Sequence, residues 1–178
     1  MGKENRKKII LNATPVIYLG KTNVLKKVLE VFDEIYITEA VYYEVVERGK
    51  EIGAEEVYIV EKYIKNGAIK VIENPSVTVD FSETYQLGKG ESSTILAAME
   101  KKCIAIVDDE RARKIGEKYN VEIHGTLFLL KLLLLLKKLN RTEIESVVKE
   151  MTNKGFRLDA HIILIFIEDI KIESSEKQ

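Results

Sequence analysis

The chain is poor in several residues that mark particular classes of protein. Its 178 residues include one cysteine, two prolines and no tryptophan. A single cysteine excludes a disulfide framework, and without a cysteine partner Cys103 argues against a zinc cluster. The charged start MGKENRKK lacks the apolar segment of a secretory signal. These features predict a protein of the cytoplasm, in which Cys103 is a small buried residue.

Long apolar runs and an excess of one charge are also missing. The strongest run, LFLLKLLLLL at 127–136, is about half the length of a membrane span and contains Lys131, which argues against a membrane protein. The 28 basic and 29 acidic residues leave a net charge of −1, so RNA binding would require a local basic patch. Charged residues, mostly lysine and glutamate, make up 32% of the chain, which is typical of heat-adapted, thermophile proteins.

Apolar runs alternate with amphipathic helical stripes along the chain. The runs predict strands at 8–12, 34–37, 68–72, 103–107 and 121–123. The stripes predict helices at 14–32 (broken near Gly20), 38–49, 54–67, 90–102, 109–119, 126–138, 142–153 and 158–169, and leave 73–84 as the longest irregular segment. Strands that are apolar throughout and separated by helices predict an α/β fold, a three-layer sandwich with a parallel sheet of four or five strands and C-terminal helices.

The same patterns predict the organisation of the chain. We expect an α/β domain at 8–138 and a C-terminal helical extension at 139–172 that packs on it. The polar tail at 173–178 is expected to be disordered.

Four acidic residues follow or begin predicted elements near the place where parallel sheets bind ligands, outside the carboxyl ends of their strands. Asp108 and Asp109 follow the 103–107 strand, and Asp108 is equally explained as a helix cap. Glu44 lies within the apolar stripe of its helix, where a carboxylate needs a metal or an ion-pair partner. Glu91 begins the 90–102 helix, where an acid also suits the positive helix end.

The order of several motifs resembles one known family. The segments ILNATPVIYLGK, YITEAVYYEVVERG, LGKGESSTILAAME, CIAIVDDERARKIGEKYNVEIHGTLFLL and NKGFRLD are similar to the PIN-domain (PilT N-terminal) family. They match its small prokaryotic branch with GEGEA-type and DDRRAR-type motifs, related to toxin–antitoxin ribonucleases, over about residues 8–168. The resemblance implies an acidic cluster that binds Mg²⁺ or Mn²⁺ for the hydrolysis of RNA.

The resemblance also implies which residues form that cluster. Glu44 and Glu91 match two of the family's acids, and either Asp108 or Asp109 matches the acid after the fourth strand. Asn12 stands where the family has its first acid. Its amide oxygen can still bind a metal, but one negative charge is lost, so metal affinity is expected to fall. Asn12 is alternatively a helix cap.

Substrate contacts are expected from Thr14, Lys89, Arg111 and Thr126, with Arg113 as a further candidate. Each also has an ordinary interpretation, either as a helix cap or as part of a solvated helix face. His124 and His161 lack metal-ligand spacing.

Three functions are therefore open. The first is a metal-dependent ribonuclease, suggested to be the toxin of a toxin–antitoxin pair. The second is a PIN-like module that binds RNA or a protein partner without catalysis, because Asn12 replaces an acid. The third, a response-regulator-like or nucleotide-binding domain built on the Asp108–Asp109 pair, lacks a phosphate loop. The leucine-rich helix near 127–136 predicts a homodimer or a surface covered by an antitoxin.

Overall fold

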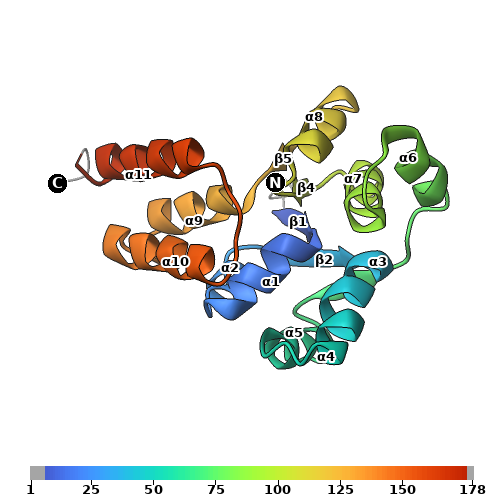
Figure 1. Cartoon of the computed structure of the whole chain (residues 1–178), viewed down its shortest axis with the longest axis horizontal. Coiled ribbons are helices and arrows are strands. Elements are labelled where there is room, and N and C mark those ends of the chain that lie inside the picture. The colour runs from blue at the N-terminus through green and yellow to red at the C-terminus, as the bar shows by residue number, and fades with distance from the viewer. Residues whose placement is uncertain (1–6, 176–178) are drawn as a thin grey trace, which may run out of the picture. The chain divides into compact units, whose positions relative to one another are not determined.

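The computed structural model of the chain describes residues 7–175, with side chains as far as Lys171. Strands and helices alternate over the first three quarters of the chain, and helices alone follow (Figure 1). The elements are β1 (Lys8–Leu11), α1 (Ala13–Lys21), α2 (Leu25–Leu29), β2 (Glu34–Thr38), α3 (Glu39–Tyr42), η1 (Tyr43–Glu47), α4 (Arg48–Glu51), α5 (Glu56–Lys65), β3 (Lys70–Ile72), α6 (Thr78–Tyr85), α7 (Lys89–Lys101), β4 (Ile104–Ile106), α8 (Glu110–Lys118), β5 (Ile123–His124), α9 (Thr126–Leu135), α10 (Arg141–Asn153) and α11 (Ala160–Ser175).

The strands of the described residues form one five-stranded parallel sheet in the order β3-β2-β1-β4-β5. This confirms the predicted α/β class and sheet. Ile10 of β1 pairs with Tyr36 of β2 on one side and with Ala105 of β4 on the other. The strand order therefore reverses at β1, and in such sheets the crevice at the carboxyl ends of the strands beside the reversal binds ligands.

The central strand β1 is buried on both faces because its side chains are apolar without alternation. Ile9, Ile10 and Leu11 are completely buried. The backbone N–H of Asn12 donates to the Ile106 carbonyl at 3.0 Å, which extends the pairing with β4 by one residue. Asn12 is thereby fixed at the carboxyl edge of the sheet.

Helices cover the sheet in two groups. Helix α7 packs over β1, β2 and β4, and its neighbours are α6 and α8. Helix α1 packs against α5 and η1. The residues buried around α7 come from many elements and form a continuous apolar cluster that includes Ile10, Tyr36, Phe81, Ile95, Ala105 and Ile115.

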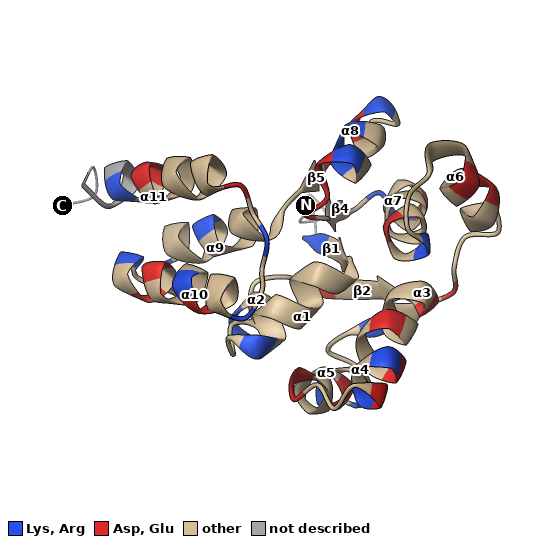
Figure 2. Cartoon of the chain, viewed as in Figure 1, with Lys and Arg blue, Asp and Glu red and all other residues tan. Residues whose placement is uncertain are grey.

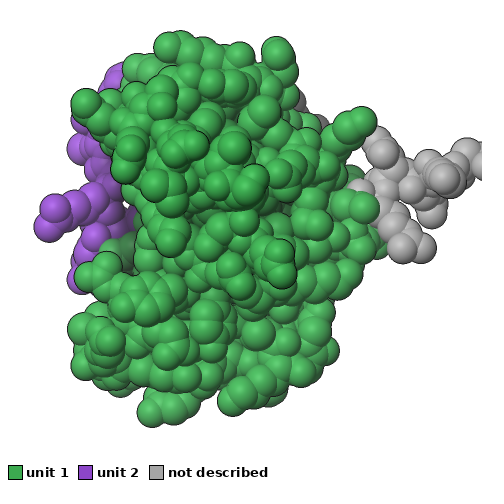
Figure 3. Space-filling view, turned by 90° about the vertical axis from the view of Figure 1, so that its right-hand side faces the viewer, with its two compact units in different colours: residues 1–126 green, residues 127–178 purple. Residues whose placement is uncertain are grey.

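The chain separates into two compact units, residues 1–126 and 127–178 (Figure 3). The first unit holds the whole sheet. The second holds most of α9 and all of α10 and α11, and Lys131 pairs with Asp169 between α9 and α11 at 3.8 Å. Within residues 7–175, no helix has both the length and the apolar content that a membrane span requires. Helix α11 runs to Ser175, and the rest of the predicted disordered tail, 176–178, lies outside the described residues.

Helix α6 was not predicted, since it lies in the segment 73–84 that was expected to be irregular. Its residues, TVDFSETY, include β-branched and short polar side chains with weak helix propensity. Packing compensates: the Phe81 ring lies 4.7 Å from that of Tyr85 and 5.4 Å from that of Tyr119, measured between centroids. Tertiary contacts therefore override local preference here.

Two other predicted helical segments contain interruptions. The break predicted near Gly20 is confirmed, since α1 ends at Lys21 and Asn23 follows in the left-handed region at φ 58°. The segment predicted as one helix at 38–49 contains the π-helix η1 between two short α-helices. Thr38 caps the start of this segment, because its side chain accepts from the Val41 N–H at 3.3 Å.

Candidate functional site

Asn12 occupies the N-cap position of α1 by its backbone, yet its side chain makes no capping hydrogen bond. The residue is only 6% exposed, and among the described residues Oδ1 has no hydrogen-bond partner. A buried acceptor left unsatisfied costs about 1–3 kcal/mol. Helix capping therefore does not explain this amide. A bound ligand that uses Oδ1 as its partner would explain it.

Glu44 is presented by the π-helix η1, which follows β2 after one short α-helical turn. π-Helical turns are rare and occur frequently at functional sites. The half-buried Glu44 carboxylate accepts a hydrogen bond from the Gly90 backbone. Burial and then the nearby charge of Glu91 raise the pKa of Glu44 above its ordinary value.

Gly90 is the place where Asn12 and Glu44 meet. A Cβ atom built on Gly90 would lie 2.8 Å from Glu44 Oε1 and 3.1 Å from Asn12 Oδ1. Any other residue would push these two side chains apart, so the first turn of α7 must carry a glycine to approach them this closely. The residue that follows β1 and the π-helix η1 thus bring two oxygen atoms to the first turn of α7.

Glu91 closes the first turn of α7 with a capping box. Its Oε2 accepts from the Gly88 N–H at 2.8 Å. Burial and then the charge of Asp109 raise the pKa of Glu91, despite the opposing Gly88 hydrogen bond. Glu91 thus caps the helix through its side chain, and its carboxylate also lies within electrostatic range of both Glu44 and Asp109.

A buried hydroxyl pair anchors this turn. Thr38 Oγ1 and Ser93 Oγ lie 2.7 Å apart, and Ser93 Oγ donates to the Gly90 carbonyl at 3.0 Å. Sequence reasoning missed Ser93, although the polar run ESST near the start of an otherwise apolar helix was a usable signal. The pair ties α7 to the end of β2, beside Glu44.

The two adjacent aspartates have different surroundings. Asp108 accepts from the Thr126 N–H at 2.7 Å and from Thr126 Oγ1 at 2.6 Å, so both its carboxylate oxygens are engaged. Burial raises its pKa, against those hydrogen bonds and the charge of Arg113. Asp109 is exposed and caps α8 through Oδ1, which accepts from Ala112 N–H at 2.7 Å. Of the two, Asp109 is the one whose charge acts on Glu91.

The remaining candidates lie around this cluster without bonding to it. Thr126 is fully buried and holds Asp108. Arg111 is exposed and donates to the Gln86 side chain at 3.4 Å. Thr14 lies in the first turn of α1 and Lys89 is the exposed first residue of α7. Within residues 7–171, no hydrogen bond or ion pair joins Thr14, Lys89 or Arg111 to Glu44, Glu91 or Asp109.

Uncompensated charge distinguishes this cluster from most of the surface. Acidic and basic residues lie close together on α4, α5 and α8 (Figure 2), as in the Lys50–Glu61 pair at 2.8 Å. No Lys, Arg or His within the described part of the chain forms an ion pair with Glu44, Glu91 or Asp109. The structure thus brings Asn12, Glu44, Glu91 and Asp109 to one edge of the sheet as acceptors.

The donor set has the chemistry of a site for a hard divalent cation. Carboxylate and amide oxygens are the ligands that Mg²⁺ and Mn²⁺ prefer, and both ions retain water ligands readily. No three His, Cys, Asp or Glu side chains of the described residues are close enough to hold an ion by themselves. A site here therefore needs the orphaned Asn12 oxygen beside Glu44 and Glu91, and the residues present fit that arrangement.

Comparisons with known proteins agree with this fold. The family model DUF3368, described as a PIN domain, matches residues 8–171. The crystal structure of PAE2754 from Pyrobaculum aerophilum matches with a TM-score of 0.50 and 13% sequence identity, over 71% of this chain and 96% of that chain. At that identity the likeness supports the fold alone. No curated protein matches the sequence.

Proposed function

The chain belongs to the DUF3368 family of PIN domains, which are typically nucleases, and on this basis we propose that it is a Mg²⁺- or Mn²⁺-dependent ribonuclease that hydrolyses RNA phosphodiester bonds. One observation carries the proposal: the buried Asn12 Oδ1 without a partner converges with the Glu44 carboxylate on Gly90. An acceptor cluster of this kind is stabilised by a cation.

In this proposal Asn12, Glu44 and Glu91 hold the ion, and Asp109 adds negative charge at the rim. A divalent ion bound there supplies a water of lowered pKa and neutralises charge on the phosphate. The Gly90 N–H orients the Glu44 carboxylate, and the Gly88 N–H orients that of Glu91. Asp108 is a positioning residue, because its two bonds to Thr126 fix the chain immediately before Asp109.

Cleavage assays with the full chain test the proposal. We expect labelled single-stranded RNA to be cut with Mn²⁺ and spared in EDTA. Glu44→Gln should slow cleavage about 100-fold or more, since loss of even an outer-shell partner costs about 10–100-fold. Glu34→Gln is the matched control, because Glu34 begins β2 and is paired with Lys8 and Lys70. Equal rates for the wild type and Glu44→Gln would refute catalysis at this site.

A second candidate function is a PIN module that binds RNA or a protein without cleaving it. Two observations favour it: Asn12 carries no charge, and the described residues contain no group of three carboxylates close enough for one ion. Asn12→Asp separates the two functions. Cleavage that appears only in this variant would identify the native chain as a non-catalytic binder, whereas a wild type that already cuts RNA would exclude that role.

We also propose that the second unit binds a protein partner, either a second copy of the chain or an antitoxin, in the cytoplasm of a heat-adapted cell. The support is apolar exposure: Leu135 is 40% and Leu136 is 44% exposed. Exposed apolar groups of this kind mark interfaces. Sedimentation velocity should show a dimer, or a monomer that shifts on adding the product of a neighbouring gene, and a monomer in both cases would contradict the proposal.

A further inference from the structure

Arg48, which directly follows η1, is a charged residue that the proposed function leaves unused. Glu44 and Arg48 are four residues apart with the glutamate first, which is the favourable spacing for an ion pair on an α-helix. The chain forms such pairs on its regular helices: Glu110 with Lys114 on α8 at 2.6 Å, and Arg141 with Glu145 on α10 at 2.7 Å. No such pair forms between Glu44 and Arg48.

Glu44 lies within η1 and Arg48 directly follows it. The Glu44 carboxylate accepts a hydrogen bond from the Gly90 backbone instead of pairing with the arginine. The arginine is left exposed at the start of α4.

Neighbouring carboxylates do not take over this arginine. Lys50 engages both Glu47, at 3.7 Å, and Glu61, at 2.8 Å. Within residues 7–171, the Arg48 guanidinium has no ion pair or hydrogen bond. It is nevertheless near the site: burial and the charge of Glu91 raise the pKa of Glu44, and the positive charge of Arg48 acts in the opposite direction.

The other two arginines near the cluster are already engaged. Arg113 Nη1 donates to the Asp108 carbonyl at 3.1 Å, and Arg111 Nη2 donates to Gln86 Oε1 at 3.4 Å. An RNA strand that approaches Glu44, Glu91 and Asp109 meets repulsion, because each of its phosphates is negative. A guanidinium with all its donors available, one turn from Glu44, offsets that repulsion and matches a phosphate in geometry.

We propose that Arg48 binds an RNA phosphate that flanks the bond addressed by the acidic cluster, an inference that rests on the proposed ribonuclease function. Arg48 would then hold the strand in place and take no part in the chemical step. Because it contacts the substrate before and after cleavage alike, its loss should raise KM much more than it lowers kcat.

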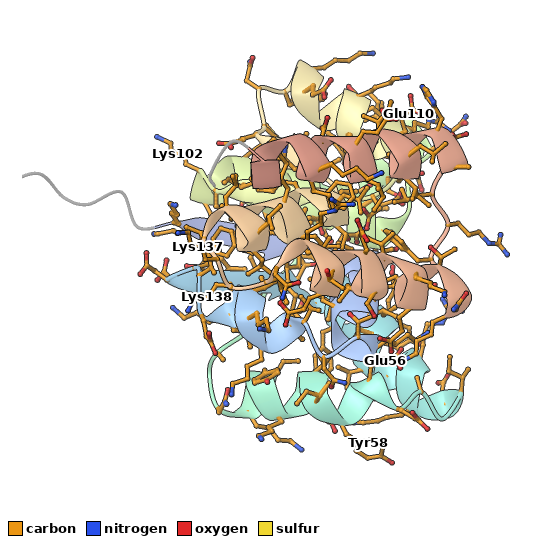
Figure 4. The ribbon with its side chains drawn as sticks, turned by 90° about the vertical axis from the view of Figure 1, so that its left-hand side faces the viewer. Glu56, Tyr58, Lys102, Glu110, Lys137 and Lys138 are labelled. Carbon is orange, nitrogen blue, oxygen red and sulfur yellow. The ribbon has the colours of Figure 1, made fainter. Side chains whose placement is uncertain are left out.

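Binding measurements test this without requiring turnover. Fluorescence anisotropy with a labelled single-stranded RNA of twelve nucleotides would compare the full chain, Arg48→Gln, Arg48→Lys and Lys102→Gln in EDTA. Lys102→Gln is the control, since it removes the same charge. Lys102 follows α7 and lies at the opposite edge from Glu110, the residue after Asp109 (Figure 4).

We expect Arg48→Gln to weaken binding about fivefold to thirtyfold and to reduce the slope of log K against log salt by about 0.7, the value for one phosphate of a single strand. Arg48→Lys should keep the slope and lose only part of the affinity, because the charge remains and the fork is lost. Lys102→Gln should change neither quantity.

The outcomes separate this inference from the function on which it rests. Arg48→Gln binding as tightly as Lys102→Gln, with an unchanged salt slope, would overturn the role of Arg48 and leave the nuclease intact. A wild-type chain that binds no RNA at any salt concentration would contradict the proposed function itself. Equal melting temperatures of the four proteins would establish that lost binding is not lost folding.

Discussion

Two glutamates ten residues apart have opposite surroundings. Glu34 begins β2, where its carboxylate meets Lys8 Nζ at 3.0 Å, Lys70 Nζ at 3.1 Å and the Tyr36 hydroxyl at 2.7 Å. Glu44 follows the other end of that strand, where a hydrogen bond from the Gly90 backbone and then the positive charge of Arg48 oppose the effect of burial. Hydrogen bonds from Tyr36, Lys8 and Lys70 lower the pKa of Glu34 to about 2, whereas burial raises that of Glu44.

The two edges of the sheet therefore have different roles. At the amino edge, the acid is already matched with cations, so it contributes to the fold and offers nothing to a ligand. At the carboxyl edge, carboxylates repel one another and an amide oxygen is unsatisfied, which costs stability. Functional sites commonly contain such unmatched polar or charged groups, because a bound ligand provides the missing interaction partner.

Asn12→Asp should have the largest effect on the carboxyl edge, because it adds a third negative charge beside Glu44 and Glu91. We expect Mn²⁺ to bind about tenfold more tightly, equivalent to about 1.4 kcal/mol, in isothermal titration calorimetry. Asn66→Asp is the matched control, since Asn66 is exposed at the end of α5. Equal Mn²⁺ affinities of the two variants would show that the site around Asn12 does not bind the ion.

A smaller effect is expected from Gly90→Ala. The added methyl group would lie 2.8 Å from Glu44 Oε1, so the carboxylate must move away from Asn12. Mn²⁺ affinity should fall about threefold to tenfold, less than the about 10–100-fold cost of losing an orienting partner, because the carboxylate is displaced and not removed. Gly116→Ala crowds a helix to a similar degree, with Ile123 Cδ1 at 3.0 Å, but near the end of α8 that is opposite to Asp109. Its Mn²⁺ affinity should equal that of the wild type.

The smallest effects are expected on thermal stability, with opposite signs. Glu34 has a folded-state pKa of about 2 against 4.5, so its contribution is present above pH 4.5 and is lost as the pH falls toward 2. Glu34→Gln should therefore lower Tm at pH 7 and leave it unchanged near pH 2. Glu44 has a raised pKa, so its charged form destabilises the fold above pH 4.5, and Glu44→Gln should raise Tm at pH 7.

Differential scanning calorimetry from pH 2 to pH 8 would measure both shifts, which should be on the order of a few degrees. Added Mn²⁺ should raise the Tm of the wild type and leave the Tm of Glu44→Gln nearly unchanged. A drop in Tm at pH 7 for both variants would show that Glu34 and Glu44 affect the stability of the fold in the same way.

The fold was readable from sequence because its central strands are apolar without interruption. Ile9, Ile10 and Leu11 could only form a strand covered on both faces, and the order of strands and helices then required a parallel sheet. Helix α6 was not predicted, because its Phe81 packs against the ring of Tyr119, which lies in another part of the chain. Helix propensity depends on the local sequence and does not reflect such contacts.

For the candidate site, the sequence suggests which residues belong to it but does not give their geometry. Sequence suggested Asn12, Glu44 and Glu91 but left Asp108 and Asp109 as alternatives, since both follow the same strand. What distinguishes them is the partner of Asp108, Thr126, which lies eighteen residues further along the chain. Orientation of this kind depends on long-range hydrogen bonds, which motif spacing does not encode.

The π-helical turn also bears on how this chain is aligned with relatives that carry an ordinary α-helix after β2. A turn that closes over five residues contains one residue more than its α-helical counterpart. An alignment without a gap would therefore pair the wrong side chains on one side of Tyr43–Glu47, each displaced by about 100° around the helix axis. A single deletion between Glu44 and Arg48 would rotate the Arg48 side chain by about 100° relative to that of Glu44.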